Sequence, residues 1–397
     1  MTVPGSWQRT ARGAMLLSEH GQLRPSIFAE MSALAAATGA INLGQGFPDE
    51  DGPPEVLEAA RQAIADGINQ YPPGFGMPVL REAIAAHQQR WYGLSVDPDA
   101  EVLVTAGATE ALAASILALT EPGDELVAFE PFYDAYAAVS ALAGVRLVTV
   151  PLRAPGFAPD LDELTAAVSD RTRIILVNTP HNPTGAVLGR EVLQHVVELA
   201  TRHDAIIITD EVYEHLTFGP EHVPLASLPG AAERTVTISS GGKTFATTGW
   251  KIGWITAPAP LLQAVLTVKQ YLTYVGGAPF QPAIAVGLGL PDTYFESVAS
   301  SLAARRDVLA AGLAAAGFQV ALPQAGYFIL ADAGPLGVTD AAAFARELPA
   351  RAGVAAIPVS SFVRPERHHE FAGWLRFAYC KRLEVLQEAS GRLALLS

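Results

Sequence analysis

Lys243 stands in the segment whose residues are best suited to covalent chemistry, SSGGKTFATTGWKIGW at residues 239–254. The segment follows an apolar, β-branched run, and small side chains and hydroxyls surround the lysine. A lysine at the end of a strand can form a Schiff base with a carbonyl compound, and small neighbours let a flat ring approach it. Partial desolvation or nearby cations would lower the pKa of its amine. Most lysines simply lie on the surface; the surrounding pattern is what favours a reactive amine here.

Two further segments place polar groups at the ends of predicted strands. NTPHNPTG (178–185) contains two prolines that fix a loop, so that Asn182 can present a rigid amide to a ligand. TDEVYEHL (209–216) ends a strand at Asp210, where a carboxylate can hold the proton of a pyridinium nitrogen, and Tyr213 follows three residues later. Taken singly, the first string could be an ordinary turn, and the second a helix-capping aspartate followed by an amphipathic tyrosine.

The elements that must position these groups alternate between strands and helices. Helices are predicted from about residue 108, over 132–143 and over 190–202, and apolar strands at residues 101–105, 125–129, 145–150, 174–180, 205–211, 235–240 and 252–258. Apolar strands separated by helices predict a mostly parallel sheet covered on both faces, with functional groups at the carboxyl ends of the strands.

The pattern changes after about residue 285, which predicts a second, smaller domain. A long helix over roughly 293–316 and four shorter strand signals indicate an α+β arrangement. We expect an N-terminal segment (1–45) that packs on the small domain, a large domain (46–285) and a small C-terminal domain (286–397).

The composition excludes several classes of protein. There are 40 acidic and 26 basic side chains and a net charge of −14, which argues against nucleic acid or an anionic membrane as a partner. The single cysteine, Cys380, cannot form an internal disulfide, so a cytoplasmic location is expected. No apolar run reaches the roughly 18 residues of a membrane span, and no signal peptide is predicted. We interpret the cluster of His368, His369 and Glu370 as a solvated loop, so no metal site is expected.

In their order along the chain, the three segments resemble those of the class I/II, fold-type I aminotransferases that depend on pyridoxal 5′-phosphate (PLP). The family pattern is completed by NLGQGFPDE (42–50), NQYPPGFG (69–76), EPFYDAY (130–136), AAIPVS (355–360) and LRFAYCKR (375–382), so the resemblance covers nearly the whole chain. NLGQGFPD is similar to the kynurenine- and methionine-type subgroup, and the nearest likeness is to actinobacterial N-succinyldiaminopimelate aminotransferases. The resemblance implies a fold-type I, seven-stranded-type sheet between helices.

The resemblance also implies a role for each matching residue of a PLP site. Lys243 would be the Schiff-base lysine and general acid/base, and Asp210 would keep the pyridine nitrogen protonated. The phenolic oxygen and the ring face would be contacted by Asn182, Tyr213 and Tyr133.

The phosphate and substrate positions follow from the same resemblance. The phosphate would be held by Ala108, Thr109, Ser240 and Lys251. Tyr71 would reach the phosphate of the neighbouring subunit, which implies a homodimer with a shared active site. The substrate would contact Arg376 through its α-carboxylate, together with Gly46, Asn182 and Phe28.

The function implied is transfer of an amino group between an amino acid, expected to be glutamate, and a keto acid or aldehyde by a ping-pong mechanism. The preferred reaction is transamination between N-succinyl-LL-2,6-diaminopimelate and 2-oxoglutarate in lysine biosynthesis. Two alternatives stay open: a broad aromatic, methionine or kynurenine aminotransferase with cysteine-conjugate β-lyase activity, and a non-catalytic PLP-binding regulator. Thr109 and Val275 depart from the kynurenine-type pattern, which weakens the transfer of that specificity.

Overall fold

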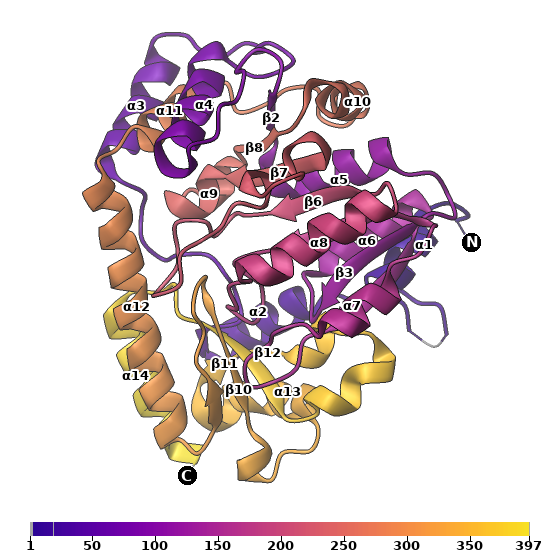
Figure 1. Ribbon diagram of the computed structural model, residues 1–397. Helices are drawn as coiled ribbons and strands as arrows, with labels where there is room; N and C mark the ends of the chain where they lie inside the picture. The colour runs from indigo at the N-terminus through magenta and orange to yellow at the C-terminus, as the bar shows by residue number, and fades with distance from the viewer. Residues whose placement is uncertain (1–2, 19, 397) are drawn as a thin grey trace.

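A seven-stranded sheet forms the centre of the molecule in the computed structural model, which describes residues 3–18 and 20–396 (Figure 1). Its strands are, in spatial order, β2 (Val102–Thr105), β8 (Gly253–Thr256), β7 (Thr235–Ser240), β6 (Ile206–Asp210), β5 (Thr172–Asn178), β3 (Glu125–Glu130) and β4 (Arg146–Pro151). Only β8 runs antiparallel to its neighbours. The mostly parallel, seven-stranded sheet expected from the sequence is therefore confirmed.

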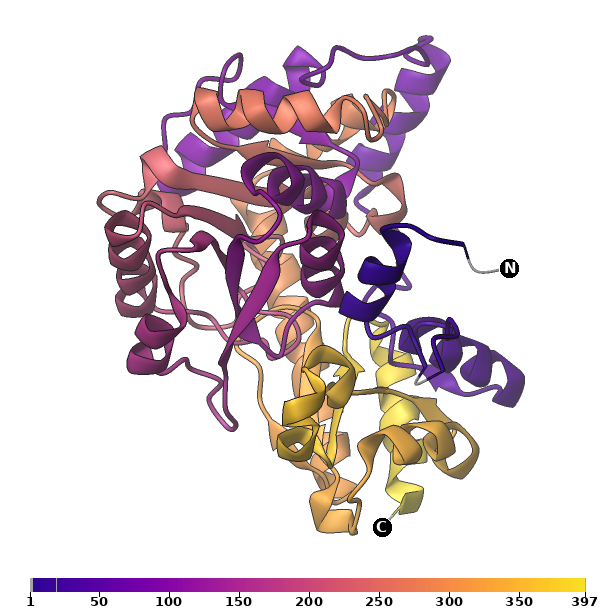
Figure 2. The same ribbon diagram turned by 90° about the vertical axis from the view of Figure 1, so that its right-hand side faces the viewer.

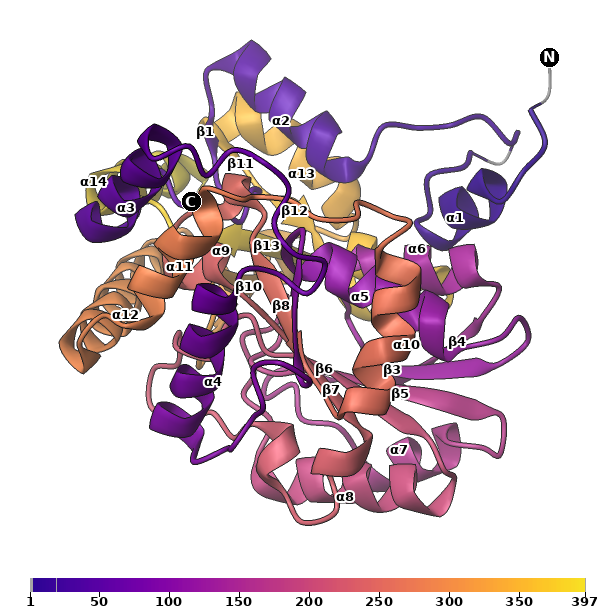
Figure 3. The same ribbon diagram turned by 90° about the horizontal axis from the view of Figure 1, so that it is seen from above.

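Helices cover both faces of this sheet because its strands are apolar on both faces. Neighbouring residues of β6 show the alternation: Ile208 packs with one helical layer and Ile207 with the other. The first layer consists of α5 (Gly107–Leu119), α6 (Asp134–Ala143) and α10 (Ala259–Lys269), and the second of α7 (Leu161–Ala167) and α8 (Arg190–Arg202). Figure 3 shows the two layers on opposite sides of the strands.

Three helices that the sequence did not predict pack beside the β2–β8 edge of the sheet. They are α3 (Pro54–Ala65), α4 (Pro78–Tyr92) and α11 (Phe280–Leu288). Both α3 and α4 begin with proline, which suits the first helical turn because its N–H groups have no intrahelical partner.

The C-terminal elements form a smaller part of the molecule below the large sheet (Figures 1 and 2). The 24-residue helix α12 (Asp292–Ala315) leads into a four-stranded antiparallel sheet. Its strands are β12 (Ile357–Pro358), β13 (Trp374–Ala378), β10 (Phe328–Asp332) and β9 (Gln319–Ala321), with α13 (Ala341–Ala352) and α14 (Leu383–Leu393) packed around them. The smaller α+β arrangement expected after residue 285 is present.

Short elements complete the chain. A two-stranded parallel pair joins β1 (Ile41–Asn42) to β11 (Val354–Ala355), and α9 (Gly241–Thr244) follows β7 directly. The 3₁₀ helices are η1 (Leu225–Ser227), η2 (Ala232–Arg234), η3 (Thr248–Trp250), η4 (Gly334–Leu336), η5 (Val359–Phe362), η6 (Pro365–Phe371) and η7 (Ala394–Leu396).

The N-terminal segment contacts both the helices on the large sheet and the smaller C-terminal part of the molecule (Figure 2). Helix α1 (Trp7–Gly13) lies against α6, where the Arg9 guanidinium donates to the carbonyls of Ala141 and Leu142 at 3.3 and 3.2 Å. Helix α2 (Ile27–Thr38) lies beside α13 in the smaller C-terminal part of the molecule. The domain boundaries at residues 45 and 285 stay predictions of the sequence. No helix within the described residues is both long enough and apolar enough to traverse a bilayer.

Candidate active site

A cavity of about 360 Å³ opens where the large sheet meets the small one. Its walls include residues at the carboxyl ends of β5, β6 and β7, together with residues of β10 and β13. Of the thirteen residues predicted from the sequence, twelve line this cavity: Phe28, Gly46, Ala108, Thr109, Tyr133, Asn182, Asp210, Tyr213, Ser240, Lys243, Lys251 and Arg376. Residues up to 348 positions apart thus share one site, as expected for the carboxyl end of a parallel sheet.

Lys243 lies in α9, the single helical turn that follows β7. Its Nζ donates to the carbonyl of Gly46 at 3.5 Å and lies 5.8 Å and 5.6 Å from the ring centres of Tyr213 and Tyr327. Burial lowers the pKa of the Lys243 amine, so a larger fraction of it is neutral and nucleophilic than for an exposed lysine.

Asp210 ends β6 and faces the cavity. Its Oδ2 accepts a hydrogen bond from the Tyr136 hydroxyl at 2.7 Å, and its Oδ1 accepts one from the Val212 N–H at 3.5 Å. Burial raises the pKa of this carboxyl, because these hydrogen bonds do not fully compensate for lost hydration. A cationic N–H placed against Asp210 would remove that penalty, so the carboxylate fits a protonated pyridine nitrogen.

The loop after β5 is fixed by a buried amide that the sequence analysis did not select. Asn178 accepts a hydrogen bond from the Asn182 N–H at 2.7 Å and donates one to the Asp210 carbonyl at 2.8 Å. Asn182 in turn accepts a hydrogen bond from the Arg376 guanidinium at 3.2 Å. The end of β5 therefore links the residues predicted to contact the ring with the arginine predicted to contact the substrate.

Arg376 is buried in β13 and carries a charge without a carboxylate partner. It donates to the Gly44 carbonyl at 3.0 Å, and its guanidinium carbon lies 3.8 Å from the ring centre of Phe328. Its Nε is buried without a hydrogen-bond partner, and no carboxylate in the described residues lies within 4.0 Å of its guanidinium. Burial lowers the pKa of Arg376 to about 10, so it stays cationic at neutral pH. A planar cation of this kind fits a ligand carboxylate.

The opposite end of the cavity fits an anion. Helix α5 begins at Gly107, whose φ of +76° and closeness to Lys251 both favour glycine: an added Cβ would lie 3.2 Å from the Lys251 Nζ. Helix N-termini present N–H groups and a positive dipole end, and Lys251 adds a full charge. Ala108, Thr109 and Ser240 line the same end of the cavity, so it suits a phosphate group.

Tyr71 is the one predicted site residue that lies outside the cavity. It is 80% exposed in the segment between α3 and α4, and its ring meets that of Tyr274 at 5.7 Å. The exposed Tyr271 and Leu272 precede Tyr274 by three and two positions, and we call these four residues the aromatic patch. The role of Tyr71 at a neighbouring subunit stays a prediction.

Several cavity residues were missed by the sequence analysis. Tyr136 and Asn178 stand inside EPFYDAY and NTPHNPTG, so their segments carried a signal although their side-chain directions did not. Phe328 is an apolar strand residue, and nothing local marks it as part of a site. His368, His369 and Glu370 are exposed in η6, consistent with a solvated surface segment.

Comparison with known proteins finds similarity along almost the entire chain. The sequence pattern of the family described as aminotransferase class I and II matches residues 38–393. The chain is 53% identical over 388 residues to the probable N-succinyldiaminopimelate aminotransferase of Mycobacterium tuberculosis, covering 95% of this chain and 98% of that protein. It is 39% identical over 373 residues to the methionine aminotransferase of Escherichia coli, with 94% and 96% covered.

A solved structure extends this similarity to three dimensions. The structure of N-succinyldiaminopimelate aminotransferase from Mycobacterium tuberculosis superposes with a TM-score of 0.93 at 51% identity, covering 100% of both chains. The matched family region includes every cavity-lining residue except Phe28.

Proposed function

The chain belongs to the class I and II aminotransferases, and we propose that it uses PLP to transfer an amino group between N-succinyl-LL-2,6-diaminopimelate and 2-oxoglutarate. As a member of this family it is a transferase enzyme with the fold of its relatives. One observation carries the proposal: Lys243, Asp210 and Arg376 share a cavity in which none of them has an oppositely charged partner within 4.0 Å among the described residues. The choice of substrate is supported by the 53% identity to the Mycobacterium tuberculosis protein.

The residues of the cavity fit PLP in three respects. Lys243 offers an amine of lowered pKa to the aldehyde, Asp210 offers a buried carboxylate to the ring nitrogen, and the start of α5 with Lys251 offers an anion site to the phosphate. When bound, PLP supplies an electron sink that stabilises negative charge at the α-carbon of the substrate.

Side chains of the protein would transfer the proton, hold the cofactor ring and orient the substrate. Lys243 would take the proton from the α-carbon and return it, because its amine is partly neutral and lies in the cavity. Asp210 would hold the proton on the ring nitrogen, while Asn182 and Tyr213 would donate hydrogen bonds to the phenolic oxygen. Arg376 would orient the substrate through its carboxylate, using donors that include the unpartnered Nε.

A half-reaction panel tests this proposal. Purified holoenzyme is mixed with one amino donor at a time, without acceptor, while the visible absorbance of the cofactor is followed. We expect rapid bleaching with N-succinyldiaminopimelate and with glutamate, and slow bleaching with methionine, kynurenine or phenylalanine. No response to N-succinyldiaminopimelate would refute the substrate, and no response to any donor would refute transamination in favour of a PLP-binding regulator.

A broad methionine or aromatic aminotransferase is the second candidate. Two phenylalanines, Phe28 and Phe328, line the cavity around Arg376, and the Escherichia coli methionine aminotransferase is 39% identical. Aromatic walls suit apolar side chains. Bleaching mainly by methionine or aromatic donors would select this candidate, and pyruvate release from a cysteine conjugate would add the β-lyase activity.

Replacing Lys243 tests the covalent attachment directly. Borohydride reduction followed by peptide mapping should find the cofactor on Lys243, one of only four lysines in the chain. Lys243→Ala should lose the attachment and reduce kcat by roughly 10⁴-fold or more. Near-normal kcat in Lys243→Ala would remove this lysine from the mechanism.

We also propose a homodimer whose subunits meet through the aromatic patch. Four large, exposed apolar side chains, Tyr71, Tyr271, Leu272 and Tyr274, support this assignment, because single monomers rarely expose such groups together. Sedimentation should show a dimer. Tyr71→Phe should weaken cofactor binding while the protein remains dimeric. A monomer with full activity would contradict a shared site. The cytoplasmic location stays a prediction of the sequence.

A further inference from the structure

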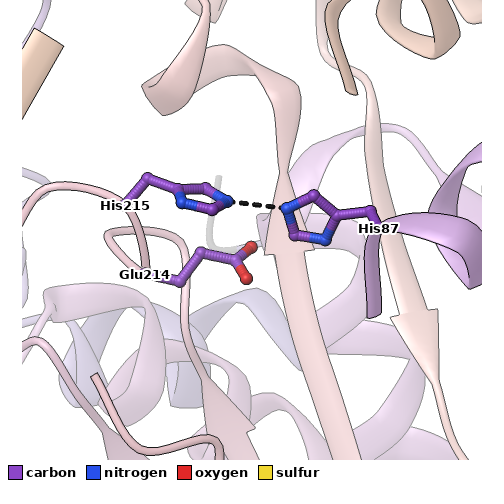
Figure 4. A group of neighbouring side chains, drawn as sticks. All are labelled: His87, Glu214 and His215. Atoms are coloured by element: carbon purple, nitrogen blue, oxygen red, sulfur yellow. Dashed lines mark hydrogen bonds between the residues drawn. The ribbon is translucent and has the colours of Figure 1, made fainter. Parts of the chain in front are cut away.

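Behind the cofactor cavity, the side chains of His87, Glu214 and His215 lie close together (Figure 4). We call this group the His–Glu cluster; its ligand atoms all lie within 4.8 Å of one another. His87 lies on α4, while Glu214 and His215 lie in the turn after β6. The two histidines are 128 positions apart, so sequence spacing could not indicate the cluster, and no metal site was expected.

The two imidazoles of the cluster face each other with their Nε2 atoms 2.6 Å apart. Two bare lone pairs would repel at this distance, so either a proton or a cation must lie between them. Burial lowers the pKa of both His87 and His215, which disfavours their charged forms. The neutral imidazole is the form that binds a metal ion.

Glu214 supplies a negative charge that no basic residue neutralises. Its carboxylate accepts hydrogen bonds from the Tyr92 hydroxyl at 2.6 Å and the Ser239 hydroxyl at 2.5 Å. Burial by itself would raise the pKa of Glu214, but the adjacent histidines and these hydroxyls lower it instead. No arginine or lysine among residues 3–18 and 20–396 pairs with it, and nearby Arg90 pairs with Asp292. A buried, uncompensated carboxylate favours a cation beside it.

From this geometry we propose that His87, Glu214 and His215 bind one divalent ion of the zinc class, with water as the fourth ligand. Two imidazoles and one carboxylate suit zinc or cobalt, whereas magnesium and calcium select oxygen ligands. Tetrahedral bonds of about 2.0–2.1 Å separate two ligand nitrogens by roughly 3.3 Å, so binding parts the imidazoles by roughly 0.7 Å. His215 keeps partial solvent exposure, which gives the ion a side from which to enter.

The carboxylate of the His–Glu cluster has outer hydrogen-bond partners, whereas the Nδ1 of His87 is buried without one. The Tyr92 and Ser239 hydroxyls orient the carboxylate, and the rings of Trp91 and Phe295 lie 4.8 and 4.4 Å from the His215 ring. Such outer partners fix the ligands and limit solvent access. The cluster does not line the cofactor cavity, so the ion would be structural. It would join α4 to the turn that follows Asp210 and carries Tyr213.

Cobalt binding tests the proposal. Untagged holoenzyme, freed of metal with a chelator and kept free of amino acids, is titrated with Co²⁺ while difference absorption spectra are recorded. We expect the visible bands of tetrahedral cobalt to saturate at one ion per chain and to disappear when Zn²⁺ is added. His215→Gln should weaken binding by at least about 100-fold, and Tyr92→Phe by roughly 10–100-fold through the loss of one outer hydrogen bond.

A matched change outside the cluster controls for loss of histidine. His195→Gln alters a half-buried histidine of α8 that bonds to Thr165, and it should leave cobalt binding unchanged. Circular dichroism checks that each variant folds; if His215→Gln does not, Tyr92→Phe decides. Absence of the bands in the wild type, or equal bands in wild type, His215→Gln and Tyr92→Phe, would overturn the proposal and leave a shared proton between the imidazoles.

Discussion

The cofactor cavity and the buried region behind it share short stretches of chain, and their neighbouring carboxylates, Asp210 and Glu211, differ in how their charge is paired. Each stretch supplies one residue to the cavity and its neighbour to the buried rear side; the pairs are Asp210 and Glu211, Tyr213 and Glu214, and Ser240 and Ser239. Asp210 ends β6, and Ser239 and Ser240 lie in β7, where successive side chains point to opposite faces; Tyr213 and Glu214 diverge in the turn after β6.

The charged groups Glu211 and Asp210 differ in how they are paired. On the rear side, Glu211 pairs with His222 at 2.8 Å and accepts further bonds from Thr209 and the Leu225 N–H. On the cavity side, Asp210 has no cationic partner within 4.0 Å in the described part of the chain, and Arg376 keeps a bare Nε. The comparison indicates that the paired Glu211 holds the backbone behind the strand ends, while Asp210 and Arg376 in front are free to meet a ligand; behind the strand ends, Glu214 is the exception because it has no basic partner among the described residues.

The largest contrast is expected between the neighbours Asp210 and Glu211. Asp210→Asn should lower kcat by roughly 10²–10³-fold, because the ring nitrogen loses its anionic partner. Apo-protein stability should hold or rise, because the buried carboxyl has a raised pKa. Glu211→Gln should do the reverse: the free energy of unfolding falls by about 3 kcal/mol, because buried His222 loses its partner, while kcat changes only a few-fold. Turnover assays measure kcat, and urea denaturation measures the free energy of unfolding. Equal losses of kcat in the two variants would contradict the expected difference between Asp210 and Glu211.

Arg376→Lys tests whether Arg376 binds the substrate carboxylate. Lysine keeps the charge but loses the planar fork, so KM for amino donor and acceptor should rise roughly 10–100-fold. Steady-state kinetics with both substrates measure the effect. Arg351→Lys, the same change at an exposed position of α13, is the control. An unchanged KM in Arg376→Lys would mean that the substrate carboxylate binds elsewhere.

His181 gives the protein a pH dependence of stability. It is buried beside Asn182, and burial lowers its pKa to about 3. Below about pH 6.5 the unfolded chain binds a proton that the folded chain refuses, so stability falls as the pH drops from about 6.5 towards 3. At pH 5 this loss is about 2 kcal/mol.

His181→Gln should therefore reduce the difference in unfolding free energy between pH 7 and pH 5 by about 2 kcal/mol. Urea denaturation at the two pH values measures it, with His368→Gln at an exposed position as the control. If the pH dependence is the same in His181→Gln and wild type, another group causes it.

The smallest contrast is expected between Ser240 and Ser239. Ser240→Ala should weaken PLP binding roughly 3–10-fold through the loss of one hydrogen bond, with little change in stability. Ser239→Ala should lower the free energy of unfolding by about 1 kcal/mol, because Glu214 loses a donor, and leave PLP affinity unchanged. Cofactor-release measurements and denaturation curves distinguish the two variants. The same change in PLP affinity and in stability in both variants would show that the cavity and the region behind it are coupled.

Much of the fold could be predicted because its strands are long apolar runs that end in polar residues. The sequence placed β2 to β8 to within a few residues, and Lys243, Asp210 and Asn182 stood out as polar groups at strand ends. It missed α3 and α4, where proline starts and mixed polarity give no strand–helix alternation. It also missed Tyr136, since nothing local shows that its hydroxyl reaches Asp210, 74 positions away.

The sequence by itself determined the strand–helix alternation, the residue types available for chemistry and the ends of the strands where they gather. Only the tertiary structure decided that Asp210 faces the cavity and Glu211 the rear, that Arg376 meets Asn182 across 194 positions, and that His87 meets His215. The physical reason is that local sequence sets backbone conformation and hydrophobic period, whereas the direction and partner of each polar side chain depend on strand register and on helices packed from distant parts of the chain.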